Sequence, residues 1–316
     1  MSVILNDYPF ALCLTHDVDR IEKTYQSIYY TVVDRRPHHL LDLLPGRNPY
    51  WQFEEIMALE DEYGVRSAFY FLDEQYLFRD KPVRSWLHPK NWVLYTGRYS
   101  IDTPEVIEII RELDAGGWEI GLHGSYESFN DHERLAQEKS NLESVLGHEV
   151  IGGRQHYLNL DPLKTWQYQA AEGLVYDSTL GSTTEFGFRG LHHPFRPFET
   201  DFVVFPLTIM ELALPGVTSD PDFAKSECER LLQEAREHRA VMTILWHPNY
   251  FADDDYPNYT DVYQFLIERA LELGAWVGPP GELYNNLEFS HESSVLGETP
   301  AWLELPAQSR VNTGIS

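Results

Sequence analysis

PDFAKSECERLLQEAREHRAVMTILWH, residues 221–247, joins a predicted helix to a predicted buried strand. Residues 221–238 carry Pro at the first helical position, and residues 241–246 form a β-branched apolar run typical of a buried strand. The same alternation recurs along the chain. We expect further strands at 10–14, 67–72, 118–122, 150–153, 174–176, 202–205, 207–212 and 275–277, and further helices at 51–62, from Pro104, at 131–146, 161–172 and 262–273.

Strands separated by helices imply right-handed crossovers and a parallel sheet. About seven such units fit one closed or nearly closed barrel better than two domains. No linker or shift in composition marks a boundary before Glu288, so we expect one α/β barrel domain at 1–288 and a peripheral tail at 289–316. The long segment 73–102 is expected as an aromatic and Arg-rich loop, and Pro206 is expected to join two short strands.

The charge of the chain excludes several kinds of partner. Asp and Glu number 50 against 24 Lys and Arg, which gives a net charge of −26. Such a chain repels a phosphate backbone and an anionic membrane surface, so nucleic acid and membrane partners are not expected. Lysine is scarce, with six residues in the whole chain. A very acidic, lysine-poor surface is typical of proteins that work in high salt, although an ordinary acidic cytosolic protein is the alternative.

The remaining composition favours a cytoplasmic protein. Cys13 and Cys228 lie far apart without a C-x-x-C motif, which fits a reducing compartment better than a disulfide framework. No apolar run is long enough for a transmembrane helix. The first residues, MSVILNDYPF, lack the basic segment and cleavage site of a secretory signal.

Polar side chains follow five of the predicted strands, at the ends that a parallel barrel brings to one face. Asp and His also favour turns for local reasons, so the recurrence rather than any one residue is the signal. The candidates are His16, Asp17 and Asp19, then His123 and Glu127, then Arg154 and His156, then Asp177, and finally His247.

Each candidate has a functional and a structural interpretation. Asp17 and Asp19 are two residues apart, so on extended backbone they face the same side and can share a cation, or one can bind it while the other accepts a proton. An Asx-turn with a helix cap is the alternative. His123 can be a ligand or a hydrogen-bonded core residue, and Arg154 can orient a carboxylate or form a salt bridge at the barrel rim. Together the set suits metal-assisted hydrolysis of an amide or ester.

The motifs resemble those of the polysaccharide deacetylase family, carbohydrate esterase family 4 with its NodB homology domain, over about residues 8–288. LTHDVD (14–19) resembles the first motif in a variant with one residue between the acids, and EIGLHGS (119–125) resembles the second. GRQHY (153–157), YDS (176–178) and LWH (245–247) stand in the places of the later motifs.

The resemblance implies a distorted (β/α)7 barrel and a role for each matching residue. It makes Asp17 the general base, Asp19 and His123 metal ligands, and Arg154 the partner of the base. It makes His247 the general acid and Asp177 the residue that tunes it. It also implies one divalent metal, with zinc expected.

The sequence departs from the family pattern at the third ligand. Glu127 stands where the family has its second metal-binding histidine, and His156 replaces the usual proline of the third motif. Either residue is a candidate third ligand. With Glu127 the donor set would be more anionic and would favour harder ions.

The function expected is removal of an N-acetyl or O-acetyl group from a sugar or a glycan precursor. Aromatic residues of segment 73–102 and segment 187–198 either line a sugar cleft or simply pack as loops. Two alternatives stay open. One is a related C–N hydrolase acting on a non-sugar amide, and the other is a catalytically silent barrel that binds a carbohydrate or a partner protein.

Overall fold

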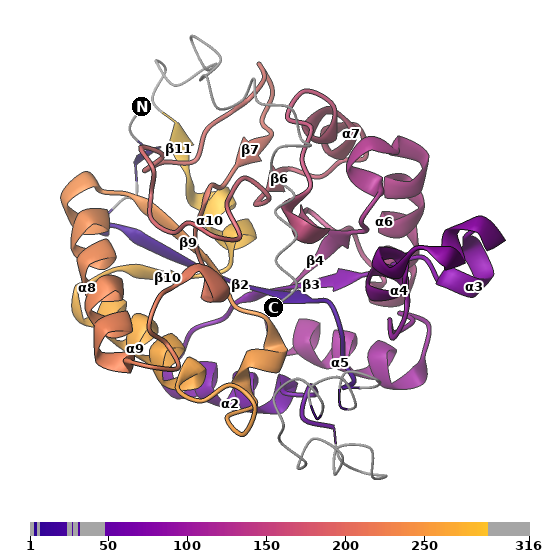
Figure 1. The fold of residues 1–316 in the computed structure, drawn as a ribbon. Helices are drawn as coiled ribbons and strands as arrows, with labels where there is room; N and C mark the ends of the chain where they lie inside the picture. Colours follow the sequence, from indigo (N-terminus) through magenta and orange to yellow (C-terminus); the bar gives the residue numbers. More distant parts are fainter. Residues whose placement is uncertain (1–2, 5–6, 24–26, 28–30, 32–47, 290–316) are drawn as a thin grey trace.

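The strands form a parallel barrel with helices around it, as seen in a computed structural model that describes residues 3–4, 7–23, 27, 31 and 48–289 (Figure 1). Neighbouring strands follow the order β7-β6-β5-β4-β3-β2-β9-β8, β10 also pairs with β2, and all these pairs are parallel. The strands are β2 (Ala11–Val18), β3 (Ala68–Leu72), β4 (Glu119–Gly124), β5 (Gly152–Gln155), β6 (Tyr176–Asp177), β7 (Val203–Val204), β8 (Leu207–Met210), β9 (Val241–Leu245) and β10 (Trp276–Gly278).

A split strand joins the two ends of the sheet. β7 pairs with β6 while β8, which follows in the same extended segment, pairs with β9. Pro206 lies between them, where a residue without an N–H interrupts strand pairing. The predicted strands joined through Pro206 are therefore confirmed, and the fold is a distorted single-domain α/β barrel.

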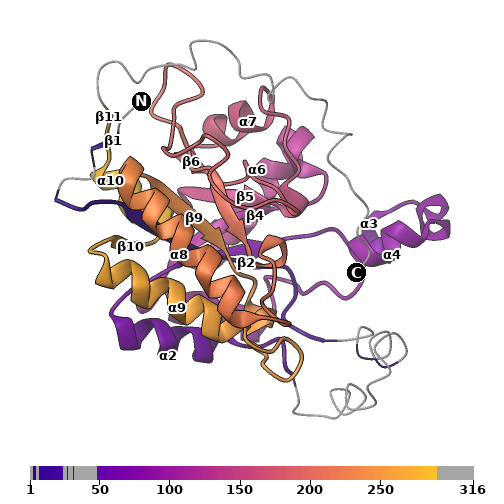
Figure 2. The same ribbon diagram turned by 60° about the vertical axis from the view of Figure 1, so that its left-hand side comes forward.

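Amphipathic helices cover the outside of the barrel (Figure 2). In α5, for example, Val106, Ile109, Ile110 and Leu113 form one buried face, as their spacing predicts. The main helices are α2 (Phe53–Tyr63), α5 (Pro104–Ala115), α6 (His132–Leu146), α7 (Thr165–Ala171), α8 (Pro221–His238) and α9 (Tyr259–Glu272). The core lies between this layer and the strands, and a second buried cluster that includes Tyr70, Tyr176 and Phe205 lies among the strands.

Helix α10 (Pro280–Asn286) was not predicted. The backbone N–H of its Gly281 donates to Glu119, at the start of β4. The antiparallel pair of β1 (Val3–Ile4) and β11 (Glu288–Phe289) was not predicted either. Of the expected tail 289–316, all but Phe289 lies outside the described residues. Among the described residues, no helix combines the length and apolar character needed to cross a bilayer.

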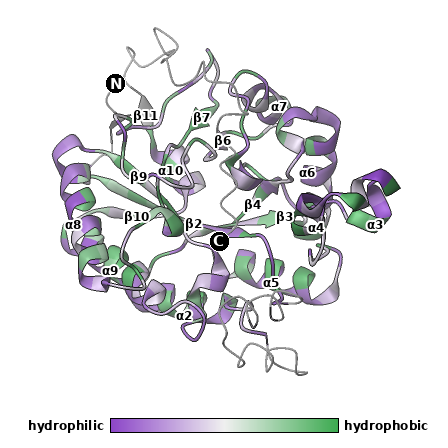
Figure 3. Cartoon of the chain, viewed as in Figure 1, coloured by the Kyte–Doolittle hydropathy of each residue, from purple (hydrophilic) through white to green (hydrophobic). Residues whose placement is uncertain are grey.

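The expected loop at 73–102 instead contains helices. They are α3 (Leu77–Asp80), η2 (Val83–Leu87) and α4 (Pro89–Tyr95). In Figure 1 α3 and α4 project from the side of the barrel, and Figure 3 shows hydrophobic residues on both. We call residues 75–98 the arm. Three short helices without a long amphipathic repeat gave no periodic signal in the sequence.

Candidate metal and proton-transfer site

The first strand carries both acidic candidates. β2 runs on through Val18, because residues 15–18 pair with β3, whereas the sequence predicted a turn after Leu14. Asp17 is buried within the strand, and the side chain of Asp19, just beyond it, is 28% exposed. The predicted two-residue spacing on extended backbone is thus present, and both carboxylates approach His123.

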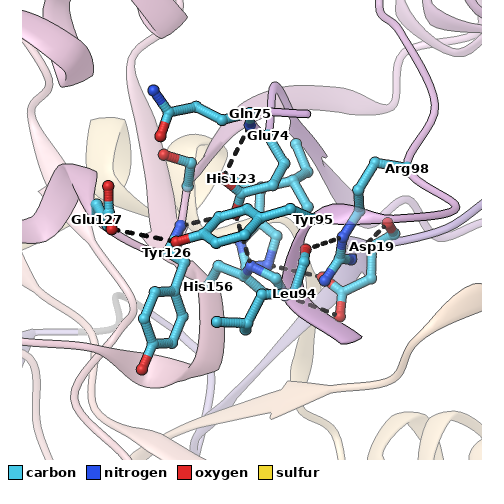
Figure 4. A network of polar contacts seen from close by, with 12 residues as sticks. Asp19, Glu74, Gln75, Leu94, Tyr95, Arg98, His123, Tyr126, Glu127 and His156 are labelled. Atoms are coloured by element: carbon cyan, nitrogen blue, oxygen red, sulfur yellow. Dashed lines mark hydrogen bonds and ion pairs between the residues drawn. The ribbon is translucent and has the colours of Figure 1, made fainter. Parts of the chain in front are cut away.

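Asp19, His123 and His156 form a group that could hold a metal ion. One potential ligand atom from each lies within 4.8 Å of the others. His123 Nε2 is 3.0 Å from Asp19 Oδ1, and His156 Nε2 is 3.4 Å from Asp19 Oδ2. His156 Nε2 is buried without a hydrogen-bond partner, as expected of a nitrogen whose lone pair can bind a metal ion. Figure 4 shows both imidazoles directed toward Asp19.

Contacts behind the histidines orient them. His123 Nδ1 lies 3.0 Å from the backbone carbonyl oxygen of Arg154, and His156 Nδ1 lies 3.3 Å from Oε2 of Glu74. Glu74 is itself buried and accepts the backbone N–H of Tyr126 at 2.8 Å. A carbonyl or carboxylate on the far nitrogen is the usual support of a metal-binding histidine, because it fixes the tautomer that leaves Nε2 as the ligand.

The charges of this group favour an ionised carboxylate. Burial alone would raise the pKa of Asp19, but the adjacent His156 and His123 outweigh it and hold that pKa well below its ordinary value. For His123, burial lowers the pKa, yet Asp17 and Asp19 together raise it above the ordinary value.

Arg154 fixes Asp17. Its side chain is fully buried, and its Nη1 donates to Asp17 Oδ1 at 2.7 Å and to Thr15 Oγ1 at 2.8 Å. The Nε and Nη2 atoms of Arg154 donate to the backbone oxygen and hydroxyl of Ser178, each at 2.8 Å. The other oxygen of Asp17, Oδ2, lies 3.7 Å from His123 Nε2, so Asp17 borders the candidate metal group.

His247 borders the same group through Asp19. Its Nε2 lies 3.8 Å from Asp19 Oδ2, and its Nδ1 lies 2.6 Å from Oε1 of the buried Glu211. Burial disfavours the charged imidazole, but the carboxylate of Glu211 and the hydrogen bond to it raise the pKa of His247 to about 10. His247 is thereby suited to donating a proton.

Glu211 is a functional candidate that the sequence reasoning missed. It follows β8 directly and is fully buried. A signal existed, because Glu211 is the charged residue inside the long apolar tract 202–215. A carboxylate at such a position usually has a specific buried partner.

Two predicted site residues lie apart from the group. Asp177 does not reach His247, because its carboxylate accepts hydrogen bonds from Trp166, Gln169 and Thr179. Glu211 occupies the position beside His247 that the sequence analysis predicted for Asp177. The carboxylate of Glu127 is 56% exposed and contacts Lys81 at 2.6 Å and the Tyr95 hydroxyl at 3.2 Å. In Figure 4 it lies beyond the Tyr95 hydroxyl, away from Asp19.

Comparison with known proteins identifies solved structures with a similar fold. No protein-family model matches the sequence, and no curated protein matches it. A solved structure assigned as a polysaccharide deacetylase from Mycobacterium smegmatis shares 16% identity and a TM-score of 0.57, over 89% of this chain and 91% of that one. A second protein so assigned, from Pseudomonas aeruginosa PAO1, shares 13% identity and a TM-score of 0.56, over 88% and 91%.

A third similar structure has a different stated activity. It is a GH57 branching enzyme from the hyperthermophilic archaeon Thermococcus kodakaraensis, in complex with glucose, with 12% identity and a TM-score of 0.52 over 91% of this chain and 72% of that one. The chain therefore has the barrel fold that these proteins share. Because proteins of different activity share it, function has to be argued from the site.

Proposed function

We propose that this protein is a divergent member of carbohydrate esterase family 4, a metal-dependent hydrolase that removes an acetyl group from an N-acetylated sugar. One observation carries the proposal: a proton acceptor and a proton donor border the same Asp-His-His group. Asp17 approaches it through His123, and His247 approaches it through Asp19. The two similar deacetylase structures support this assignment through their fold.

Different residues of the chain serve different steps of amide hydrolysis. A divalent cation at the group would polarise the scissile carbonyl and acidify water. Asp17, held by Arg154, accepts the proton of the attacking water. His247, charged through its contact with Glu211, donates a proton to the leaving nitrogen, so that the amine departs without developing negative charge.

We propose zinc as the cation. Two imidazole nitrogens and one carboxylate oxygen are a donor set that zinc accepts in catalytic sites, with a further position for water. Asp19, His123 and His156 would hold it, and Glu127 would not. The silent-barrel hypothesis would have Glu127 as a defective ligand, and the position of His156 beside Asp19 and His123 argues against that hypothesis.

The test measures metal and acetate together. Protein purified with zinc, then stripped by a chelator and reloaded, is assayed for acetate release from N-acetylated sugars, O-acetylated sugars and simple non-sugar acetamides. We expect stoichiometric metal and turnover of a sugar substrate that disappears on stripping and returns on reloading. Turnover of the acetamides alone would favour the non-sugar amide hydrolase. A protein that binds no metal and releases no acetate would refute the proposal.

A further inference from the structure

Two tyrosine rings extend outward from the candidate metal ligand His156. The ring of Tyr157 lies 4.5 Å from that of His156, and the ring of Tyr126 packs edge-on against Tyr157 at 5.6 Å. Tyr157 is 49% exposed. An exposed tyrosine ring beside a reactive centre is a platform on which a flat apolar face, such as that of a pyranose, can pack.

The backbone of Tyr157 has a disfavoured conformation. Tyr157 has φ +59° and the next residue, Leu158, has φ +54°, both in the left-handed region that side chains disfavour. Backbone strain of this kind persists mostly at functional positions. The turn that follows β5 therefore serves to present His156 and Tyr157 together.

A lysine completes this row of side chains. Lys90, on α4, donates from Nζ to the Tyr126 hydroxyl at 2.8 Å, and the same Nζ is 5.1 Å from the centre of the Tyr126 ring. Lys90 is exposed, and within the described part of the chain no carboxylate pairs with it. Neighbouring cations differ, since Lys81 pairs with Glu127 and Arg79 with Asp80.

The charge of the arm is opposite to that of the protein. The chain as a whole has a net charge of −26, yet residues 75–98 hold five basic residues and one acidic residue. The arm also borders the site directly, because Arg98 donates from Nη1 to the backbone oxygen of Asp19 at 3.0 Å (Figure 4). A segment of net positive charge beside the site, on an otherwise negative surface, attracts an anionic substrate more than a neutral one.

We infer that Tyr157, Tyr126 and Lys90 form a subsite for an acidic sugar unit next to the acetylated one, so that the substrate is an anionic glycan. This inference rests on the proposed function for the position of the acetylated sugar. The tyrosine rings pack against the sugar, and the Lys90 ammonium binds its anionic group. A carboxylate of a uronic acid and a sugar phosphate offer Lys90 the same chemistry.

The test is a ratio of kcat/KM values at one fixed ionic strength. An oligosaccharide of alternating N-acetylglucosamine and glucuronate is compared with a neutral chito-oligosaccharide of equal length, and N-acetylglucosamine 1-phosphate is compared with N-acetylglucosamine. We expect the acidic member to be preferred, and the pair with the larger preference identifies the source of the charge. Lys90→Gln should lower that preference about tenfold, the usual worth of one charged hydrogen bond.

Two control variants make the result specific. Lys90→Arg keeps the cation and should retain most of the preference. Lys225→Gln removes one positive charge from α8, on the outer layer, and should leave the ratio at the wild-type value. Equal kcat/KM values for acidic and neutral sugars, or a preference that survives Lys90→Gln, would overturn the subsite while leaving the deacetylase proposal standing.

Failure of the proposed function gives a different result. If neither kind of sugar loses acetate, calorimetry on the zinc-loaded protein compares their binding instead. Tighter binding of the acidic oligosaccharide that Lys90→Gln abolishes would uphold the subsite without the reaction. Equal binding of the two would end the inference.

Discussion

At the scale of single residues, two acids two positions apart have different surroundings. Asp17 is buried and tied to Arg154, whereas Asp19 is partly exposed and faces both candidate histidine ligands. A guanidinium that donates to one oxygen of a carboxylate fixes its orientation, which suits a base. A carboxylate that faces the Nε2 atoms of two imidazoles suits a ligand.

The first prediction separates these two roles. Asp17→Asn keeps the shape of the side chain but loses the basic oxygen, so turnover should fall by about 10²–10⁴-fold with metal content nearly intact. Asp19→Asn should instead lose the metal and the activity with it. Elemental analysis beside acetate release measures both. If Asp17→Asn empties the site while Asp19→Asn keeps its metal, the roles are reversed.

The second prediction concerns the third ligand. His156→Gln should lower zinc affinity by about 10–100-fold or more, because loss even of a ligand's supporting contact has an effect of that size. Glu127→Gln is the matched control and should bind zinc as the wild type does, since Glu127 contacts Lys81 and Tyr95 instead. Competition with a chelator of known affinity measures both variants. The opposite order of affinities would make Glu127 the ligand.

The sequence predicted most of the residues that meet at this site but not all of their partners. Asp17, Asp19, His123, Arg154 and His247 are close together as expected, because the ends of β2, β4, β5 and β9 meet on one face of the barrel. Glu127 was a candidate because it stands where the family has its second metal-binding histidine, four residues after His123. That spacing brings two side chains to one point only on a helix, whereas strand β4 continues to Gly124.

At the scale of elements, the accuracy of the prediction follows the length of the local pattern. Helix α8 has the predicted bounds, because Pro221 marks its start and eighteen residues carry its pattern. Strand β2 is longer than predicted, since His16 and Asp17 favour turns locally but pair with β3 in the structure. Pairing with a distant strand is not visible in a short window of sequence.

The third prediction concerns Gly153, which lets β5 approach β4 closely. A Cβ on Gly153 would lie 2.0 Å from the backbone oxygen of Leu122 in β4, and this backbone has no flexible end that could move away. Gly153→Ala should therefore separate β4 from β5 and destabilise the fold by about 1–3 kcal/mol or more. It should also displace Arg154, the next residue, and so lower turnover.

The control for this variant is a glycine at a helix end. Gly64 has φ +65° and open space around the position of a Cβ, so Gly64→Ala should cost about 1 kcal/mol through its backbone alone and spare turnover. Thermal melting and acetate release compare the two variants. A Gly153→Ala protein as stable and active as Gly64→Ala would show that the two strands can separate without harm.

At the scale of the whole molecule, acidic residues dominate the outer layer. Helix α8 alone carries five acidic residues against three Lys and Arg, and its partner α9 adds more acids. Some acids are paired, as Glu229 is with Arg269. Since Asp and Glu outnumber Lys and Arg by 50 to 24, negative charge is in large excess, and the acids repel one another across the folded surface.

The last prediction follows from this repulsion. At about 0.01 M salt the screening length is about 30 Å, comparable to the barrel itself, whereas at about 1 M it is about 3 Å. Unfolding moves like charges apart, so it relieves repulsion in dilute buffer but gains nothing in concentrated salt. The melting temperature should therefore rise from dilute buffer to molar potassium chloride, and most steeply at the low end, where screening changes most. Sucrose is the control, because it stabilises by exclusion without screening and should give no such steep initial rise. A flat or falling melting temperature in potassium chloride would contradict the predicted adaptation to high salt. It would not bear on the hydrolase proposal.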